Sequence, residues 1–198
     1  MKKITLAVLA IGSLTALHAQ IDAHQWLVGG KTKLSFTSQD FMGDKIKETD
    51  FRFRPNVGFF PVDKWAVGVN LDFEASSYEY PGSPKQKYNE IGAGLFTRYY
   101  FLDKTKKTNL FAEAGFNVGG YKYDTDDERT NYNKLNIGVS TAIFLNRHVA
   151  LEIGVDYSTR KWEDEDERIN RFGLCGGFQI HLDPCRKAVT REASVDQY

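Results

Sequence analysis

The sequence predicts an all-β protein, an eight-stranded antiparallel up-and-down transmembrane β-barrel. Three observations support this fold class: apolar side chains recur at every second residue, one face of each segment carries no charge, and short and long connections alternate. Each segment is as long as a tilted membrane-spanning strand of about 9–11 residues, or somewhat longer. The eight predicted strands cover residues 25–36, 50–60, 65–75, 88–101, 109–122, 134–145, 148–158 and 169–182.

The first four segments place apolar residues at one parity. In chain order these are Trp26, Val28, Leu34 and Phe36; Phe51, Phe53, Val57 and Phe59; Trp65, Val67, Val69, Leu71 and Phe73; and Ile91, Ala93, Leu95, Tyr99 and Phe101. Pro55 lies inside the second segment and cannot donate a hydrogen bond to a strand ladder, so we expect a bulge or an early strand end there.

The last four segments continue the same alternation. Their apolar positions are Leu110, Ala112, Ala114, Phe116 and Val118; Leu135, Ile137, Val139, Ile143 and Leu145; Val149, Leu151, Ile153, Val155 and Tyr157; and Phe172, Leu174, Phe178, Ile180 and Leu182. No charged residue falls on this face in any of the eight segments.

The opposite face carries glycines and charged residues. The charged positions are Lys31, Lys33, Arg52, Arg54, Asp72, Glu74, Glu90, Arg98, Glu113, Glu152, Asp156 and Arg171. An eight-stranded lumen is just wide enough for ordinary side chains, so the small and charged face fits the inside better than the bulky apolar face does. The apolar face then requires lipid outside it.

Hairpin register predicts how these inward charges pair. The expected lumen salt bridges are Arg54–Asp72, Arg52–Glu74, Arg98–Glu113 and Asp156–Arg171. Because isolated buried charge is costly, we expect the network to fill and close the barrel, with a gated narrow pore as the alternative.

The connections predict how the barrel sits in the membrane. Stretches 61–64, 102–108 and 146–147 are short, whereas 37–49, 76–87, 123–133 and 159–168 are long and polar. Short periplasmic turns and longer external loops are typical of outer-membrane barrels, and an even strand number leaves both termini in the periplasm. An aromatic girdle is expected at the turn side, formed by Trp26, Trp65, Tyr99 and Phe101.

The chain ends differ from the barrel in composition. Residues 1–19 read as a signal peptide, with Lys2 and Lys3 before an apolar stretch that is too short to span a membrane as a helix. The barrel is expected over 20–182, followed by a disordered periplasmic tail over 183–198. Cys175 lies too far along its strand from Cys185 for an intramolecular disulfide, so none is expected.

Several segments resemble the small OmpA/OmpX-type outer-membrane β-barrel proteins of Gram-negative bacteria. The likeness is carried by residues 55–68 (PNVGFFPVDKWAVG), by 111–115 (FAEAG) and by 150–154 (ALEIG). It implies the fold, outer-membrane lipid and lipopolysaccharide as surroundings, and recognition by the barrel assembly machinery during biogenesis. Two features depart from this family: the last strand ends on Leu182 rather than on an aromatic residue, and no peptidoglycan-binding domain follows.

The sequence offers little sign of catalysis. Of the mature histidines only His181 is expected to face inward, with no serine and acid at the same height, so no catalytic residue is assigned and an enzyme that modifies lipid is the weakest hypothesis. No cofactor or metal is expected, although the acidic stretches at 124–128 and 163–167 leave cation bridging to lipopolysaccharide open. The formal charge of zero gives no reason to expect nucleic acid. A monomeric barrel with a structural or surface-interaction role is therefore favoured, and its external partner is unknown.

Overall fold

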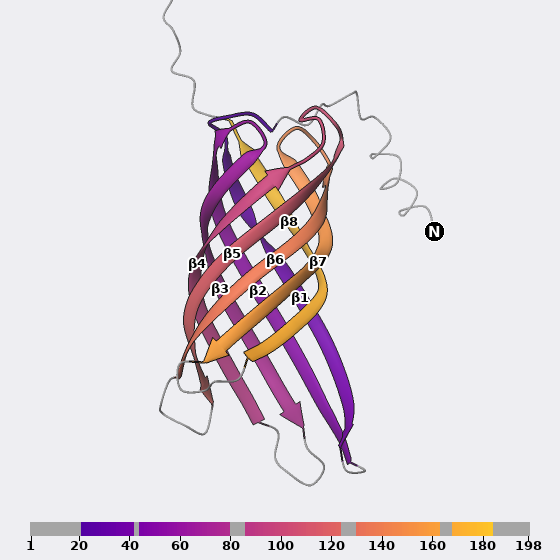
Figure 1. Cartoon of the computed structure of the whole chain (residues 1–198). Coiled ribbons are helices and arrows are strands. Elements are labelled where there is room, and N and C mark those ends of the chain that lie inside the picture. The colour runs from indigo at the N-terminus through magenta and orange to yellow at the C-terminus, as the bar shows by residue number, and fades with distance from the viewer. Residues whose placement is uncertain (1–20, 42–43, 80–85, 124–129, 163–167, 184–198) are drawn as a thin grey trace, which may run out of the picture.

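The computed structural model describes residues 21–41, 44–79, 86–123, 130–162 and 168–183. These residues form a closed barrel in which each strand pairs antiparallel with its sequence neighbours and β8 returns to β1 (Figure 1). The strands are β1 (Trp26–Phe41), β2 (Asp44–Val62), β3 (Trp65–Glu79), β4 (Gln86–Tyr100), β5 (Thr108–Tyr123), β6 (Thr130–Phe144), β7 (Val149–Trp162) and β8 (Arg168–Leu182). The predicted fold class is confirmed.

The two ends of the barrel differ. The short connections and both ends of the described chain lie at the upper end in Figure 1, here called the turn end. The opposite end is called the loop end. The predicted signal peptide, the acidic stretches, Cys185 and the tail from residue 184 onward all lie outside the described residues. Within the described ranges, no helix is long and apolar enough to cross a membrane.

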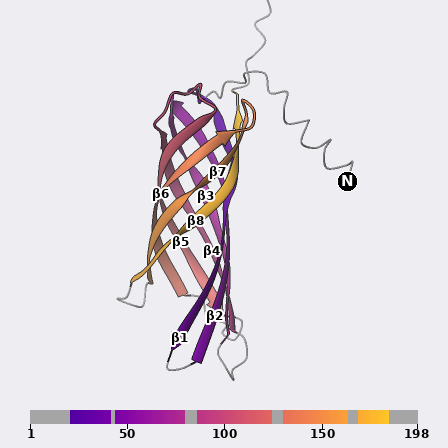
Figure 2. The same cartoon turned by 90° about the vertical axis from the view of Figure 1, so that its right-hand side faces the viewer.

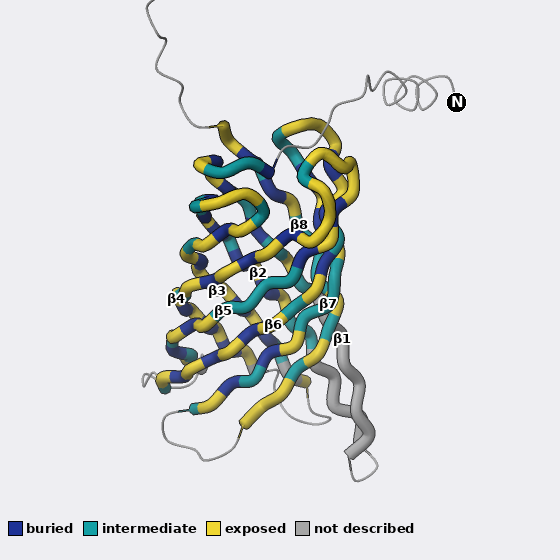
Figure 3. Tube along the Cα trace, turned by 45° about the horizontal axis from the view of Figure 1, so that its top comes forward, coloured by how far each residue is buried: buried dark blue, intermediate teal, exposed yellow. Residues whose placement is uncertain are grey.

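Burial alternates along most of the strands, as the colours in Figure 3 show. On β4, Leu95 is 65% exposed on the outside, whereas Phe96 and Arg98 are buried inside. An apolar exterior of this size would be an aggregation surface in water, so it fits a membrane solvent instead.

Several strands run further toward the loop end than the sequence predicted. The predicted connection 37–49 is wrong, because β1 continues to Phe41 and β2 begins at Asp44. Likewise β7 continues to Trp162, past the predicted end at 158. Ladder hydrogen bonds need only the backbone, so strands can continue where the alternating side-chain pattern ends.

Pro55 does not produce the bulge or strand end that was expected. β2 continues through it, Pro55 pairs with Gly30 of β1, and the register with β3 is the same on both sides of it. The register shift lies instead between Phe59 and Val62, at the β2–β3 turn, where Lys64 adopts a positive φ of 67°. A proline that lacks a donor therefore interrupts the ladder without inserting a residue.

Aromatic side chains cluster in the lumen near the turn end. This aromatic floor consists of Phe60, Tyr100, Phe111, Phe144 and His181, all at most 2% exposed. Ring centroids lie 5.1 Å apart for Tyr100 and Phe111, and 5.2 Å apart for Phe144 and His181. These rings therefore pack against one another inside the barrel.

Residues 21–25 cover the aromatic floor from outside and form a turn-end plug. Ile21 is fully buried against the floor, and the His24 amide donates to the Phe60 carbonyl over 2.7 Å. The Ala23 amide donates to Asp63, and the Gln25 amide group donates to Asp183. These bonds tie the plug to the β2–β3 turn and to the end of β8.

The wall closes along an incomplete seam. β1 and β8 pair over seven residues only, from Trp26 opposite Leu182 to Thr32 opposite Gly176. Beyond that point β1 pairs with β2 alone and β8 with β7 alone. Figures 1 and 2 both show the β1–β2 hairpin diverging from β7 and β8 toward the loop end.

Candidate functional site

The lower part of the charged lumen, just above the aromatic floor, is organised around Arg98. This residue is 1% exposed, and its guanidinium donates to Glu113 over 2.6 and 2.9 Å and to Glu152 over 2.6 Å. It also donates to the Tyr100 hydroxyl and lies over the Phe111 ring, 4.2 Å from the ring centroid. Lys31 adds a 2.7 Å bond to Glu113. Two cations therefore neutralise two carboxylates, with hydrogen bonds in the directions that a planar guanidinium favours.

Glu74 of β3 is the centre of the upper part of the charged lumen, nearer the loop end. Arg52 donates to it from the adjacent strand, and Arg160 reaches it across the lumen over 3.0 Å. Arg171 of β8 forms a third ion pair with it. One carboxylate thus ties together strands from opposite walls.

A buried lysine completes this upper network. Lys134 is 1% exposed and lies 2.5 Å from Asp72 and 2.8 Å from Glu90. Arg160 contacts Glu90 over 2.6 Å. Multiple partners for every ion are what buried charges require, because a single partner rarely offsets the loss of water.

The structure brings together three of the four pairs expected from the sequence. The Arg98–Glu113, Arg52–Glu74 and Arg54–Asp72 contacts are all present, the last at 3.4 Å. The Asp156–Arg171 pair is wrong. In the β7–β8 hairpin Asp156 faces Gly173, and Arg171 faces Ser158, two residues away from the expected register.

The separated partners bind other residues. Asp156 accepts a 3.2 Å bond from Lys33 of β1, while Arg171 binds Glu74.

Lys134 and Arg160 were missed as lumen residues. Lys134 has the inward parity of β6, so the sequence contained the signal. The sequence pattern predicts a loop at Arg160, because the alternation ends at residue 158, whereas β7 continues past it.

The four residues predicted as an aromatic girdle lie outward at the turn end. Trp26, Trp65, Tyr99 and Phe101 are 44–50% exposed. Trp65 pairs with Tyr99 across β3 and β4, and its indole donates to Thr97 over 2.7 Å. Exposed aromatic rings with polar groups, at one level along the barrel axis, are typical of a membrane interface.

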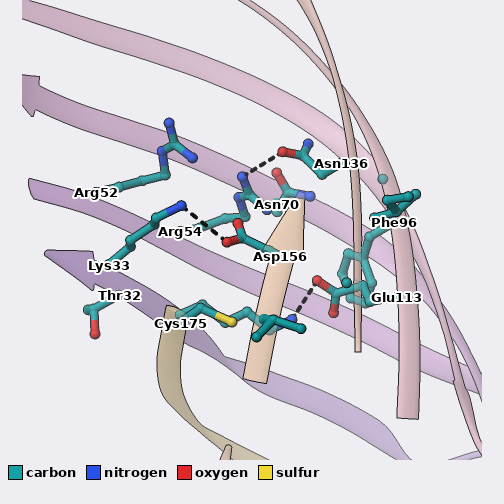
Figure 4. Close-up of a pocket in the computed structure, with 15 residues that line it drawn as sticks. Thr32, Lys33, Arg52, Arg54, Asn70, Phe96, Glu113, Asn136, Asp156 and Cys175 are labelled. Atoms are coloured by element: carbon teal, nitrogen blue, oxygen red, sulfur yellow. Dashed lines mark hydrogen bonds and ion pairs between the residues drawn. The ribbon is translucent and has the colours of Figure 1, made fainter. Parts of the chain in front are cut away.

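Asparagines separate the two charged parts of the lumen. Asn136 donates to Asn117 over 2.9 Å, Asn117 donates to Asn70, and Arg54 donates to Asn136 over 3.1 Å. Beside them is a cavity of about 30 Å³. Figure 4 shows Lys33, Asp156, Glu113 and Cys175 converging on it. A space of this size holds about two water molecules.

Charged residues outside the membrane band hold the turns together. Lys104 bonds to Asp22 of the plug and to Asp63 of the β2–β3 turn, over 2.6 and 2.9 Å. Hydrogen bonds to both carboxylates raise the pKa of Lys104, and its ammonium lowers the pKa of Asp63. The backbone and hydroxyl of Thr105 lower the pKa of Asp103 in the same region.

A closed barrel with an apolar wall, interfacial aromatics and a charged lumen is the architecture of an integral outer-membrane protein. In the part of the chain that the structure describes, no three His, Cys, Asp or Glu side chains lie where they could share a metal ion.

Solved structures with the same architecture come from Gram-negative outer membranes. Neisserial surface protein A matches with a TM-score of 0.54 at 13% identity, over 79% of this chain and 96% of that one. The outer-membrane protein OprG from Pseudomonas aeruginosa matches with a TM-score of 0.52 at 13% identity, over 83% and 99%. No protein-family model and no curated protein sequence matches the chain. The chain therefore has the fold of the small outer-membrane β-barrels.

Proposed function

We propose that this protein is a structural or surface-presenting outer-membrane barrel whose lumen is closed to solutes, with both termini in the periplasm. The observation that carries the proposal is the double block inside the barrel. The aromatic floor and its plug close the turn end, and the ion networks around Arg98 and Glu74 fill the space above. Buried ion networks with several partners per charge resist opening because each broken contact leaves a desolvated charge.

The outer surface supports the same placement. An apolar wall implies surrounding lipid, and the turn-end aromatics fit the inner interface of the membrane. Lipopolysaccharide around the loop end, handling by the barrel assembly machinery and a monomeric state belong to the same proposal. A working surface would then lie in the connections at the loop end.

Single-channel conductance of the refolded mature barrel in a planar bilayer tests the proposal. The expected result is a silent bilayer, with folding of the same sample verified by a heat-modifiable shift on gels. Reproducible current steps from the folded protein would overturn the closed lumen and favour a narrow channel. The Arg98–Glu113 pair would then be the first site to mutate.

A further inference from the structure

The incomplete seam lies within the membrane-spanning height of the wall, so it is an opening in the wall and not a gap above the membrane. From Leu182 to Phe172 β8 rises ten residues, about 33 Å along the strand and about 25 Å along the barrel axis at a tilt of about 40°. Pairing with β1 stops at Gly176, about 15 Å up by the same arithmetic. An apolar band is about 25 Å tall, so the opening faces the half of the membrane nearer the loop end.

The opening has an apolar lip. Leu174 and Phe172, on the free edge of β8, are 74% and 72% exposed, more than any other large apolar side chain that the structure describes. Their exposure follows from the missing β1 neighbour. Open sheet edges are not stable against lipid alone, because unpaired backbone groups find no hydrogen-bond partner there.

The cavity beside the asparagines reaches this opening. It is lined by Thr32, the last paired residue of β1, and by Lys33 and Cys175, which a continued register would place opposite each other. Lys33 spans the opening: its ammonium occupies the space that a Cβ at Gly173 would need, and it bonds to Asp156 of β7. The Lys33–Asp156 pair is therefore a latch across an unpaired stretch of wall.

The cavity offers several cationic donors. Lys31, Lys33, Arg52 and Arg54 line it together with the carboxylates of Glu113 and Asp156. Arg52 and Arg54 also pair with Glu74 and Asp72, which are not among the lining residues. The Nη1 of Arg52 and the Nε of Arg54 are buried without a hydrogen-bond partner among the described residues, and their side chains are 7% and 10% exposed. Buried donors of a cation without an acceptor are costly, and an anionic group in the cavity would satisfy them.

We propose that the seam is a membrane-facing portal for a long-chain carboxylate. Its carboxylate would enter beside Thr32, take over Lys33 from Asp156 and meet the arginine donors, while its alkyl chain stays in the membrane against Phe172 and Leu174. The cavity has room for about two waters, which suits a carboxylate and excludes a phosphodiester headgroup. This site is independent of whether the lumen conducts, so it goes beyond the proposed function.

Cysteine pairs test the opening directly, in the mature protein carrying Cys175→Ser and Cys185→Ser and refolded in phosphatidylcholine vesicles. Leu34→Cys with Leu174→Cys continues the seam register beyond its last pair. Val28→Cys with Ile180→Cys is the matched control, because Val28 and Ile180 are paired. The control pair is expected to oxidise in air, whereas the seam pair requires a catalyst that traps transient approach. Spontaneous oxidation of both pairs would show a closed seam and overturn the portal.

Binding is measured with carboxyl-¹³C palmitate by NMR and by native mass spectrometry, using the same refolded protein. Saturable 1:1 binding is expected. Lys33→Met should weaken it about tenfold, the equivalent of one charge-assisted hydrogen bond, while Asp156→Asn should strengthen it because the competing carboxylate is gone. A gain of affinity requires a folded barrel, so Asp156→Asn separates the effect from misfolding. Lys104→Met, the same substitution at the turn end, should leave binding unchanged.

Two further arms identify the route and the source. Locking the oxidised Leu34→Cys/Leu174→Cys bridge should abolish palmitate binding, and acetate should not compete at equal concentration. Palmitate bound equally by locked and open barrels, or by all the variants, would reflect partition into the bilayer and refute the site. Acetate binding as tightly as palmitate would show access from water through the lumen, which refutes a membrane portal.

Discussion

Removing the cation at Arg98 is expected to destabilise the barrel strongly. Glu152 has Arg98 as its one hydrogen-bonded cation in the described structure, whereas Glu113 keeps Lys31. Arg98→Met therefore leaves one buried carboxylate without a partner. Breaking a buried pair in this way costs about 3–5 kcal/mol, which at an m-value of about 2 kcal/mol/M lowers the urea midpoint by roughly 2 M.

The measurement is equilibrium unfolding in urea of barrels refolded in phosphatidylcholine vesicles, followed by tryptophan fluorescence and gel shift. Glu152→Gln alone should cost about 1–2 kcal/mol, because Arg98 still binds Glu113. The double variant Arg98→Met with Glu152→Gln should be more stable than Arg98→Met alone, since no orphan carboxylate remains. Lys106→Met, at an exposed turn position, serves as the control and should keep a midpoint near that of the wild type.

Two results would refute the reasoning. A free energy of unfolding within about 0.5 kcal/mol of the wild type for Arg98→Met would mean that the lumen is wet enough to solvate Glu152. A double variant whose loss equals the sum of the two single losses would mean that Arg98 and Glu152 are not energetically coupled.

Four more substitutions probe the wall and the turns by the same unfolding assay. Gly68→Ala should cost about 1–3 kcal/mol, because its Cβ would overlap Phe96 and a neighbouring backbone carbonyl. Gly176→Ala should be near neutral, because its Cβ would meet only the Glu152 carbonyl oxygen, at an ordinary contact distance of 3.8 Å. Lys64→Gly should stabilise by about 0.5–1 kcal/mol by relieving a positive φ of 67°. The pKa of Asp63 is lowered, so its ionised carboxylate stabilises the fold at neutral pH, and this stabilisation is lost when acid protonates it. The difference in urea midpoint between wild type and Asp63→Asn should therefore persist to pH 5 and vanish only below the ordinary Asp range. An unchanged midpoint for Gly68→Ala, a lower one for Lys64→Gly, or a difference for Asp63→Asn that grows on acidification would contradict these expectations.

Local sequence predicts the wall of this barrel well. Period-two alternation needs only neighbouring residues, and it assigns Leu95 to the outside and Arg98 to the inside correctly. Short turns also fix register, which is why Arg98 meets Glu113 across the β4–β5 hairpin. Where the loop is long, as between β7 and β8, the register depends on the whole sheet, and the expected Asp156–Arg171 pair is wrong for that reason.

Contacts across the lumen cannot be predicted from period-two alternation or from hairpin register. Arg160 reaching Glu74 and Lys33 reaching Asp156 depend on strand tilt and on how far the barrel is staggered when it closes. The short β1–β8 seam and the buried Ile21 have the same origin, since both join parts of the chain that are remote in sequence.

Formation of the turn-end plug also marks the end of barrel folding. Its bond from Gln25 to Asp183 joins residues 158 positions apart, so it forms only after β8 has joined the sheet. Contacts of such separation are slow, because a long loop must close before they contribute. Protection of a cysteine introduced at Ile21 against a water-soluble maleimide would therefore serve as a clock for the last step of barrel folding.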